Sequence, residues 1–130
     1  MIYLASPYTH RDSAVCEQRF NDACSAAAEL MRAGFSVFSP IVQSHPLVPY
    51  GLPTEWDFWR AQDCEHLRRC DSMIVLTLNG WKLSRGVQAE INLAIAMDLP
   101  IHYLSPETIS NWSGGNTIMS MRPFSQETSS

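Results

Sequence analysis

The order of short apolar runs and helix-like stretches constrains this chain more than any other feature of its sequence. Each apolar run is four to six residues long, which is strand length, and proline, glycine or asparagine follows closely after it. Strands that alternate with helices form parallel sheets whose crossovers place helices on both faces. The sequence therefore predicts a single-domain α/β protein over residues 1–125, with an open parallel sheet of the flavodoxin or Rossmann kind and a frayed tail at 126–130. The predicted strands are residues 2–5, 35–39, 73–78 and 101–104.

Three stretches between these runs have the spacing of amphipathic helices. They cover residues 12–34, which Gly34 closes, then 54–69, which a capping box opens, and 84–98, for which Ser84 is the N-cap. The segment 40–53 contains four prolines and is interpreted as a loop of about fourteen residues. It is too apolar for simple disorder, so we expect it to form a lid or a wall.

Charge and composition exclude several classes of protein. The chain has 13 acidic and 9 basic residues and no basic stripe, which disfavours binding to a nucleic acid polymer. No apolar run approaches the ~20 residues of a membrane span, and no signal peptide is evident, so we expect a cytoplasmic protein. The 4 cysteines form no C-x-x-C pair and no zinc-like spacing, which indicates reduced thiols and no metal site.

The carboxyl ends of the predicted strands indicate where a ligand would bind, because open parallel sheets bind ligands at that edge. Ser84 begins a helix whose free amides attract anions, and Gly86 lets a ligand approach the backbone closely. Lys82 and Arg85 add positive charge beside them. The sequence therefore indicates an anion site here, although a capped helix after a strand is also common without a ligand.

Glu90 is an acid in a stretch that otherwise has the pattern of a buried helix face. Val87, Ile91 and Ala94 recur at helical spacing, and Glu90 lies on or beside their stripe. Two interpretations remain open. Either the carboxylate faces a cleft and has a chemical role, or its stem packs at the edge of the stripe while its head reaches water.

Three other residues are candidates for a site. Asp63 lies near the middle of the second predicted helix, where an acid needs solvent or a partner, and paired carboxyl groups are typical of glycosidic chemistry. Tyr3 can project its hydroxyl toward the carboxyl end of the first strand, and a buried tyrosine usually finds a hydrogen-bond partner. His45 is explained equally well as a ligand contact and as a turn residue.

Three segments, IYLASPY, DCEHLRRCDSMIVL and SRGVQAEINLAIAMDLPI, resemble the nucleoside 2-deoxyribosyltransferase superfamily. Within it, the resemblance points to the 2′-deoxynucleoside 5′-monophosphate N-glycosidases and the small bacterial and phage proteins of unknown function beside them. It covers about residues 1–104, with most of 40–59 unmatched. The resemblance implies that Glu90 is the nucleophile that attacks the anomeric carbon. It also implies that Asp63 helps the base to depart and that Tyr3 orients Glu90.

The same resemblance implies how a substrate would be held. Ser84 falls where the monophosphate hydrolases keep a serine that contacts phosphate and where transferases acting on free nucleosides keep an aspartate. Members of the family donate a C-terminal residue into a neighbour's site, and Asn116 or Ser120 is the candidate here. The first loop departs from the family's glycine-rich turn, and the expected contacts to sugar and base there are Ser6, Pro7 and Tyr8.

We therefore expect hydrolysis of the N-glycosidic bond of a nucleoside 5′-monophosphate, most simply a deoxyribonucleotide, without a metal or an organic cofactor. One alternative is a nucleoside 2-deoxyribosyltransferase, which uses the same site but a second base as acceptor. Another is a nucleotide-binding protein without turnover. We also expect a homodimer or a higher homo-oligomer, because sites of the family are completed between subunits and because one predicted helix begins with the aromatic residues Trp56, Phe58 and Trp59.

Overall fold

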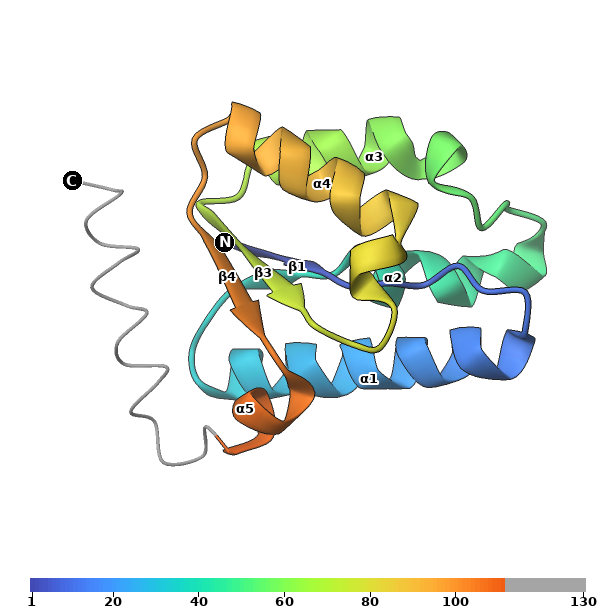
Figure 1. Ribbon diagram of the computed structural model, residues 1–130, viewed down its shortest axis with the longest axis horizontal. Helices are drawn as coiled ribbons and strands as arrows, with labels where there is room; N and C mark the ends of the chain where they lie inside the picture. Colours follow the sequence, from blue (N-terminus) through green and yellow to red (C-terminus); the bar gives the residue numbers. More distant parts are fainter. Residues whose placement is uncertain (112–130) are drawn as a thin grey trace.

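The computed structural model describes residues 1–111, so Asn116, Ser120 and the expected tail at 126–130 lie outside the described residues. Four parallel strands form one sheet in the order β2-β1-β3-β4 (Figure 1). This order, with the first strand inside and the second at the edge, is that of the doubly wound α/β folds. It confirms the predicted fold class. The strands are β1 (Ile2–Ala5), β2 (Val37–Phe38), β3 (Ser72–Leu76) and β4 (Ile101–Leu104).

Helices cover both faces of the sheet, as Figure 1 shows. On one face lie α1 (Ser13–Arg32) and the short α5 (Pro106–Ser110), and on the other lie α3 (Trp56–Arg68) and α4 (Arg85–Ala96). Side chains alternate along each strand between the two faces. Leu4 and Ile74 pack in the core beside α1, whereas Tyr3 and Val75 pack in the core beside α3 and α4. The alternation therefore sends the side chain of Tyr3 toward the α3 and α4 side.

The ends of α1 and α4 confirm the signals in the sequence. The Asp12 carboxylate accepts a hydrogen bond from the Ala14 amide at 2.9 Å, and Gly34 follows α1 with a φ of +98°. The Ser84 hydroxyl accepts from the Val87 amide at 3.2 Å and caps α4. That helix ends two residues before the expected Asp98, which takes a φ of +58°.

The prediction of a loop over residues 40–53 is wrong. The segment forms helix α2 (Pro40–Ser44) followed directly by a 3₁₀ helix, η1 (His45–Tyr50). The Ser39 hydroxyl accepts from the Val42 amide at 3.3 Å, and Pro40 occupies the first helical turn, where its missing amide costs nothing. A serine followed by proline is therefore a helix start here, although the number of prolines suggested a loop.

The expected capping box at residues 54–57 is also wrong. Glu55 is the N-cap of α3 and makes no capping hydrogen bond with its side chain. The Thr54 carbonyl instead accepts from the Thr9 hydroxyl at 3.3 Å, and the Asp57 carboxylate accepts from Arg85 at 3.0 Å. The two residues join α3 to other elements rather than to its own first turn.

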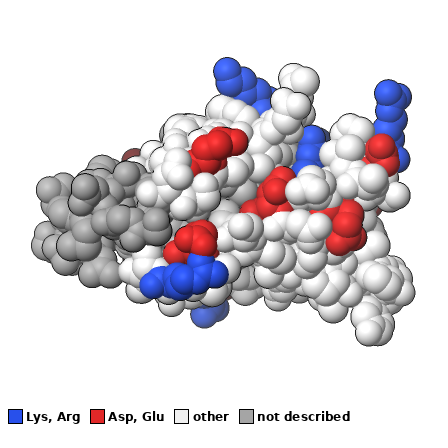
Figure 2. Space-filling view, turned by 90° about the horizontal axis from the view of Figure 1, so that it is seen from below, with Lys and Arg blue, Asp and Glu red and all other residues white. Residues whose placement is uncertain are grey.

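The distribution of surface charge and the character of the helices test two of the expectations, that the protein binds no nucleic acid polymer and no membrane. The face seen in Figure 2 carries separate acidic and basic groups, and no continuous basic patch appears on the part of it that the structure describes. Across residues 1–111, no helix combines the length and the apolar character that crossing a membrane requires.

Candidate active site

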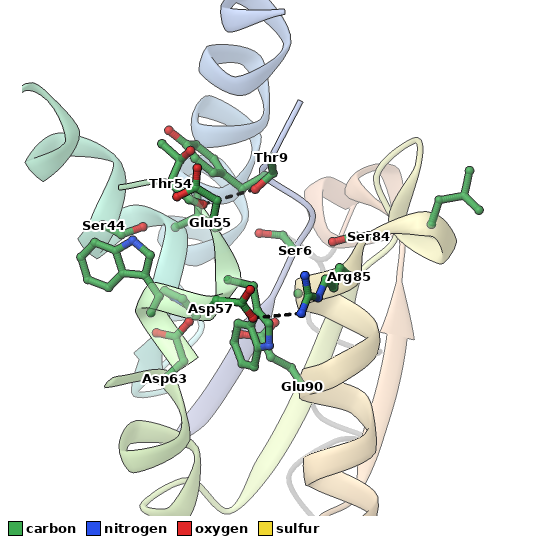
Figure 3. A pocket seen from close by; sticks show the side chains of 17 residues that line it. Ser6, Thr9, Ser44, Thr54, Glu55, Asp57, Asp63, Ser84, Arg85 and Glu90 are labelled. Carbon is green, nitrogen blue, oxygen red and sulfur yellow. Dashed lines mark hydrogen bonds and ion pairs between the residues drawn. The ribbon is translucent and has the colours of Figure 1, made fainter. Parts of the chain in front are cut away.

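A pocket of about 390 Å³ opens where the segments after β1, β2 and β3 meet the first turns of α3 and α4. Its volume lies in the range usual for small-molecule sites, and its position is the one expected for a ligand of an open parallel sheet. Figure 3 shows side chains reaching into it from both helices, with Asp57 and Asp63 on α3, Ser84 and Arg85 at the start of α4, and Glu90 near the middle of α4. The expectation that the segment after β2 forms a wall is confirmed, because Pro40, Ile41 and Ser44 line the pocket.

Glu90, Asp63 and Tyr3 are brought together on one side of the sheet. Glu90 is 5% exposed and Asp63 is 7% exposed, and both line the pocket. The Tyr3 hydroxyl, which is buried, donates a short hydrogen bond to Oε2 of Glu90. The interpretation of Glu90 as an edge residue with its head in water is therefore wrong, because its carboxyl group is buried and bonded within the protein.

Burial changes the acidity of all three groups. It raises the pKa of Asp63 to about 7 and the pKa of Glu90 to about 8. The Tyr3 hydrogen bond acts in the opposite direction on the pKa of Glu90, whereas the Asp63 carboxyl adds to the rise. Burial, with the charges of Glu90 and Asp63, also raises the pKa of Tyr3 well above its usual value, so its hydroxyl stays protonated. Near neutral pH the two coupled carboxyl groups therefore share protons rather than both being charged.

The first turn of α4 and the end of β1 form a polar end of the pocket. The Ser84 oxygen accepts from Val87, which leaves its O–H free to donate, and helix geometry leaves the amides of Arg85 and Gly86 without intrahelical acceptors. Ser6 lies after β1, is 5% exposed, and its hydroxyl has no hydrogen-bond partner within residues 1–111. In Figure 3, Ser6 and Ser84 lie toward one end of the pocket, and Asp63 and Glu90 lie toward the other.

Gly86 is not required by the fold itself. Its φ is not in the left-handed region, and a Cβ atom there would meet Trp56 only at an ordinary contact distance of 3.9 Å. A glycine in a helix costs about 0.5–1 kcal/mol relative to alanine. The missing side chain of Gly86 thus leaves room for a ligand to approach the backbone at the start of α4.

The aromatic residues at the start of α3 divide between the pocket and the surface. Trp56 and Trp59 line the pocket, and the Trp59 indole donates to the Pro53 carbonyl at 2.8 Å. Phe58 is 48% exposed and lies edge-on to Trp59. The sequence pattern favours a subunit interface for all three, whereas in the structure two of them form a wall of the pocket. The homo-oligomer stays a prediction, with Phe58 as the remaining exposed member of the group.

The remaining sequence candidates lie at or behind the pocket wall. Tyr8 lines the pocket, whereas Pro7 is buried and neither Pro7 nor His45 is among the described lining residues. His45 stacks on Phe20, exchanges a hydrogen bond of 2.7 Å with the Tyr8 hydroxyl, and pairs with Glu17 at 3.1 Å. His45 therefore fixes the position of the Tyr8 ring without being one of the described lining residues.

Sequence reasoning missed several residues that line the pocket. Asp57 was assigned to a helix cap, and its ion pair with Arg85 joins residues 28 positions apart, which no local pattern reveals. Ile41 and Ser44 belong to the wall that the sequence predicts after β2, but the helix that carries them, which Ser39-Pro40 begins, is predicted as a loop. The others that the sequence does not predict at the pocket are Thr9, Thr54, Glu55, Trp56, Trp59 and Leu83.

The raised pKa values predict an unusual dependence of stability on pH. Both carboxyl groups hold protons more tightly in the folded protein than in the unfolded chain. Their contribution to stability is therefore complete below about pH 4 and is lost as the pH rises through about 7 to 8. We expect the free energy of unfolding to fall by a few kcal/mol from about pH 5 to about pH 9, as measured by urea titration. Glu90→Gln should flatten this slope, whereas Glu107→Gln, at an exposed position, should leave it in place; an equal slope in all three proteins would contradict the assignment.

Comparison with known proteins identifies the family of this chain. No curated protein matches the chain. The family model for a domain of unknown function, DUF1937, matches residues 1–105, which include all four strands and all described residues that line the pocket. The chain therefore belongs to the DUF1937 family.

Proposed function

We propose that this protein hydrolyses the N-glycosidic bond of a nucleoside 5′-monophosphate, most simply a deoxyribonucleotide. The observation that carries the proposal is Glu90, a buried carboxyl group that lines the pocket and accepts a hydrogen bond from Tyr3. A pocket with two protonatable carboxyl groups suits glycosidic chemistry, because one group can attack while the other transfers a proton. The resemblance of the surrounding segments to deoxyribosyltransferases and monophosphate N-glycosidases supports the same assignment.

The reaction would proceed in two displacements at the anomeric carbon. The Glu90 carboxylate attacks C1′ and forms a glycosyl ester while the C1′–N bond breaks, and Asp63 gives its proton to the departing base. Asp63, now a carboxylate, then takes a proton from water, which attacks C1′ and releases Glu90. The products are the free base and 2-deoxyribose 5-phosphate. The pKa of Asp63, about 7, allows this carboxyl group to serve first as acid and then as base near neutral pH.

Tyr3 would act by positioning Glu90. Its hydroxyl donates to Oε2, which fixes the orientation of the carboxyl group, and the other oxygen, Oε1, is left for the attack. The hydrogen bond also favours the charged form of Glu90, which the attack requires.

The polar end of the pocket would hold the phosphate. Glu90 lies six residues beyond Ser84 along α4, or about 9 Å at the rise of an α-helix, and this is of the order of the span from a 5′-phosphate to the anomeric carbon. The Ser84 and Ser6 hydroxyls and the free amides at the start of α4 are donors that suit phosphate oxygens. Trp56 and Trp59 offer flat apolar surface for a base.

The proposal is tested by a screen for released base. The protein is incubated with deoxynucleoside and ribonucleoside 5′-monophosphates and with the matching nucleosides, and free base is followed by chromatography. Release from monophosphates alone supports the proposal. A parallel incubation with a second free base distinguishes a transferase, because a transferase would yield new nucleosides or nucleotides instead of the free sugar phosphate.

One observation favours a binding protein without turnover as the second candidate. The pKa of Glu90 is raised to about 8, so this carboxyl group mostly holds its proton at neutral pH. A carboxyl group that stays protonated in the complex cannot attack C1′. Tight binding of a monophosphate with no base released over hours would support this candidate.

We expect Ser84→Asp to discriminate against phosphorylated ligands. Aspartate is an equally good N-cap, so α4 should keep its start, but its carboxylate would occupy the anion site and repel phosphate. Monophosphate binding should weaken at least about thirtyfold, equivalent to ~2 kcal/mol, while nucleoside binding changes little. The measurement is titration calorimetry with both ligands in the Glu90→Gln background, which prevents turnover, and Ser84→Thr, which keeps the hydroxyl, is the control. Equal effects on nucleotide and nucleoside would refute the phosphate assignment.

A further inference from the structure

The pocket is lined by more acidic than basic side chains, which matters for the binding of an anionic ligand. Four acidic side chains line it, and Arg85 is the one basic residue among the described lining residues. Two more cations lie nearby but are not among the described lining residues: Arg19 donates to the Thr9 carbonyl at 3.0 Å, and Lys82 lies over the Trp81 ring at 5.8 Å. A phosphate would therefore enter a predominantly acidic pocket, and Arg85 is the lining residue able to offset that charge. The four acids are Glu55, Asp57, Asp63 and Glu90.

Arg85 occupies a position that is unfavourable for a cation in the absence of a partner. It is the first residue of α4, where the helix dipole presents its positive end. Asp57 in the first turn of α3 accepts from its guanidinium at 3.0 Å, and Figure 3 shows this ion pair between the two helices. The side chains of Arg85 and Asp57 are 77% and 68% exposed, so solvent screens the pair and a competing anion can displace Asp57.

A second observation points to a ligand at the same end of the pocket. The Ser6 hydroxyl is buried, lines the pocket and has no hydrogen-bond partner within residues 1–111. A buried hydroxyl without a partner is costly unless a ligand or water satisfies it. Ser6 comes from the segment after β1, so this signal is independent of α4 and its dipole.

We propose that Arg85 is a specificity-determining residue for phosphomonoesters and that Asp57 holds it until a phosphate binds. On binding, the guanidinium exchanges the Asp57 carboxylate for two oxygens of the phosphate, in the fork geometry that arginine prefers. The third terminal oxygen faces the hydroxyl and amide donors of Ser6, Ser84 and Gly86. A phosphodiester or a carboxylate has only two such oxygens and leaves part of this donor set unsatisfied. This inference rests on the proposed function, because it places the phosphate of that substrate at the start of α4.

The test is a double-mutant cycle on binding to the full chain. The variants are Arg85→Gln, Asp57→Asn and the combination of the two, and the probes are inorganic phosphate, a deoxynucleoside 5′-monophosphate, its methyl phosphodiester and the free nucleoside. Titration calorimetry gives the four affinities, with every variant made in the Glu90→Gln background so that the monophosphate is not consumed. Arg68→Gln is the matched control, since Arg68 is also an exposed arginine on a helix, paired with Glu65 at 3.1 Å, and is not among the described lining residues.

We expect Arg85→Gln to weaken monophosphate binding at least about tenfold and nucleoside binding hardly at all. Asp57→Asn should tighten monophosphate binding severalfold, because the guanidinium is released. That gain should vanish when Arg85 is also replaced, and the preference for the monoester over the diester should shrink in Arg85→Gln.

Several outcomes would overturn the inference. The first two are an unchanged affinity for the monophosphate in Arg85→Gln and weaker binding of the monophosphate in Asp57→Asn. The others are equal losses of affinity for nucleotide and nucleoside in Arg85→Gln, and no measurable binding of inorganic phosphate or of the monophosphate to the unmutated site. The proposed function can fail separately. Binding that depends on Arg85 without base release would leave this inference standing, and base release that is insensitive to Arg85 would overturn the inference alone.

Discussion

Glu90→Gln is expected to abolish base release while leaving the fold and monophosphate binding nearly intact. Glutamine keeps the volume of the side chain and still accepts the Tyr3 hydrogen bond, so packing in the buried site changes little. It cannot act as a carboxylate nucleophile. The loss should therefore lie in kcat, by roughly three or more orders of magnitude, and not in the affinity for substrate.

The measurement is a time course of free base beside thermal melts with and without monophosphate. Glu107→Gln, an exposed change of the same kind, serves as the control and should keep full turnover. A shift in melting temperature on adding monophosphate shows that the variant still binds. Turnover in Glu90→Gln at even about a tenth of the wild-type rate would be incompatible with a nucleophilic role.

Asp63→Asn should have the second largest effect, and its size should depend on the leaving group. Asparagine cannot give a proton to a departing base, so base release should slow by roughly 10²–10⁴. The p-nitrophenyl glycoside of 2-deoxyribose 5-phosphate releases p-nitrophenolate, a leaving group that needs little protonation. The first displacement on this substrate should therefore be largely spared in Asp63→Asn. A burst of nitrophenolate followed by slow turnover would then be seen, because the second step still lacks its base.

The pH profile provides the companion measurement for Asp63. The active form holds one proton, with Asp63 protonated and Glu90 charged. It is the less populated of the two singly protonated forms, because Glu90 has the higher pKa, and kcat/KM should be bell-shaped with limbs near about 7 and 8. Loss of the Asp63 proton produces the alkaline limb. That limb should disappear in Asp63→Asn, and a profile in which it persisted, or equal slowing of both leaving groups, would exclude Asp63 as the general acid.

Local signals predicted most of the fold. Asp12, Gly34 and Ser84 act within one helical turn of their own positions, so helix ends there follow from the sequence. The short β2 was overestimated because Phe35 is still engaged with the end of α1, its amide donating to the Leu30 carbonyl at 3.1 Å. α2, η1 and α5 were missed, since prolines permit the first turn of a helix as readily as they break a later one.

The candidate site was predictable only in part. The alternation along a strand and the periodicity of a helix place Tyr3 and Glu90 on buried faces of β1 and α4. The parallel order of the sheet then brings these two faces into contact. The periodicity of α4 could not decide whether the Glu90 carboxyl group reaches water, because that depends on the side chains of α3 and β1 that pack around it. The Asp57–Arg85 pair and the unsatisfied Ser6 hydroxyl depend on the packing of separate elements, and no spacing in the sequence encodes them.

The helical form of the segment after β2 has a consequence for how fast and how tightly a ligand can bind. The five residues of α2 and the six of η1 form regular structure through hydrogen bonds within the chain, such as the one from the Val42 amide to the Ser39 hydroxyl. A disordered loop that closed over a ligand would lose about 1–2 kcal/mol of backbone entropy per residue at that moment. Here this cost belongs to folding, so even a fragment such as a sugar phosphate meets a completed wall. Association would then follow a single phase whose rate rises in proportion to ligand concentration, without a plateau set by closure of that segment.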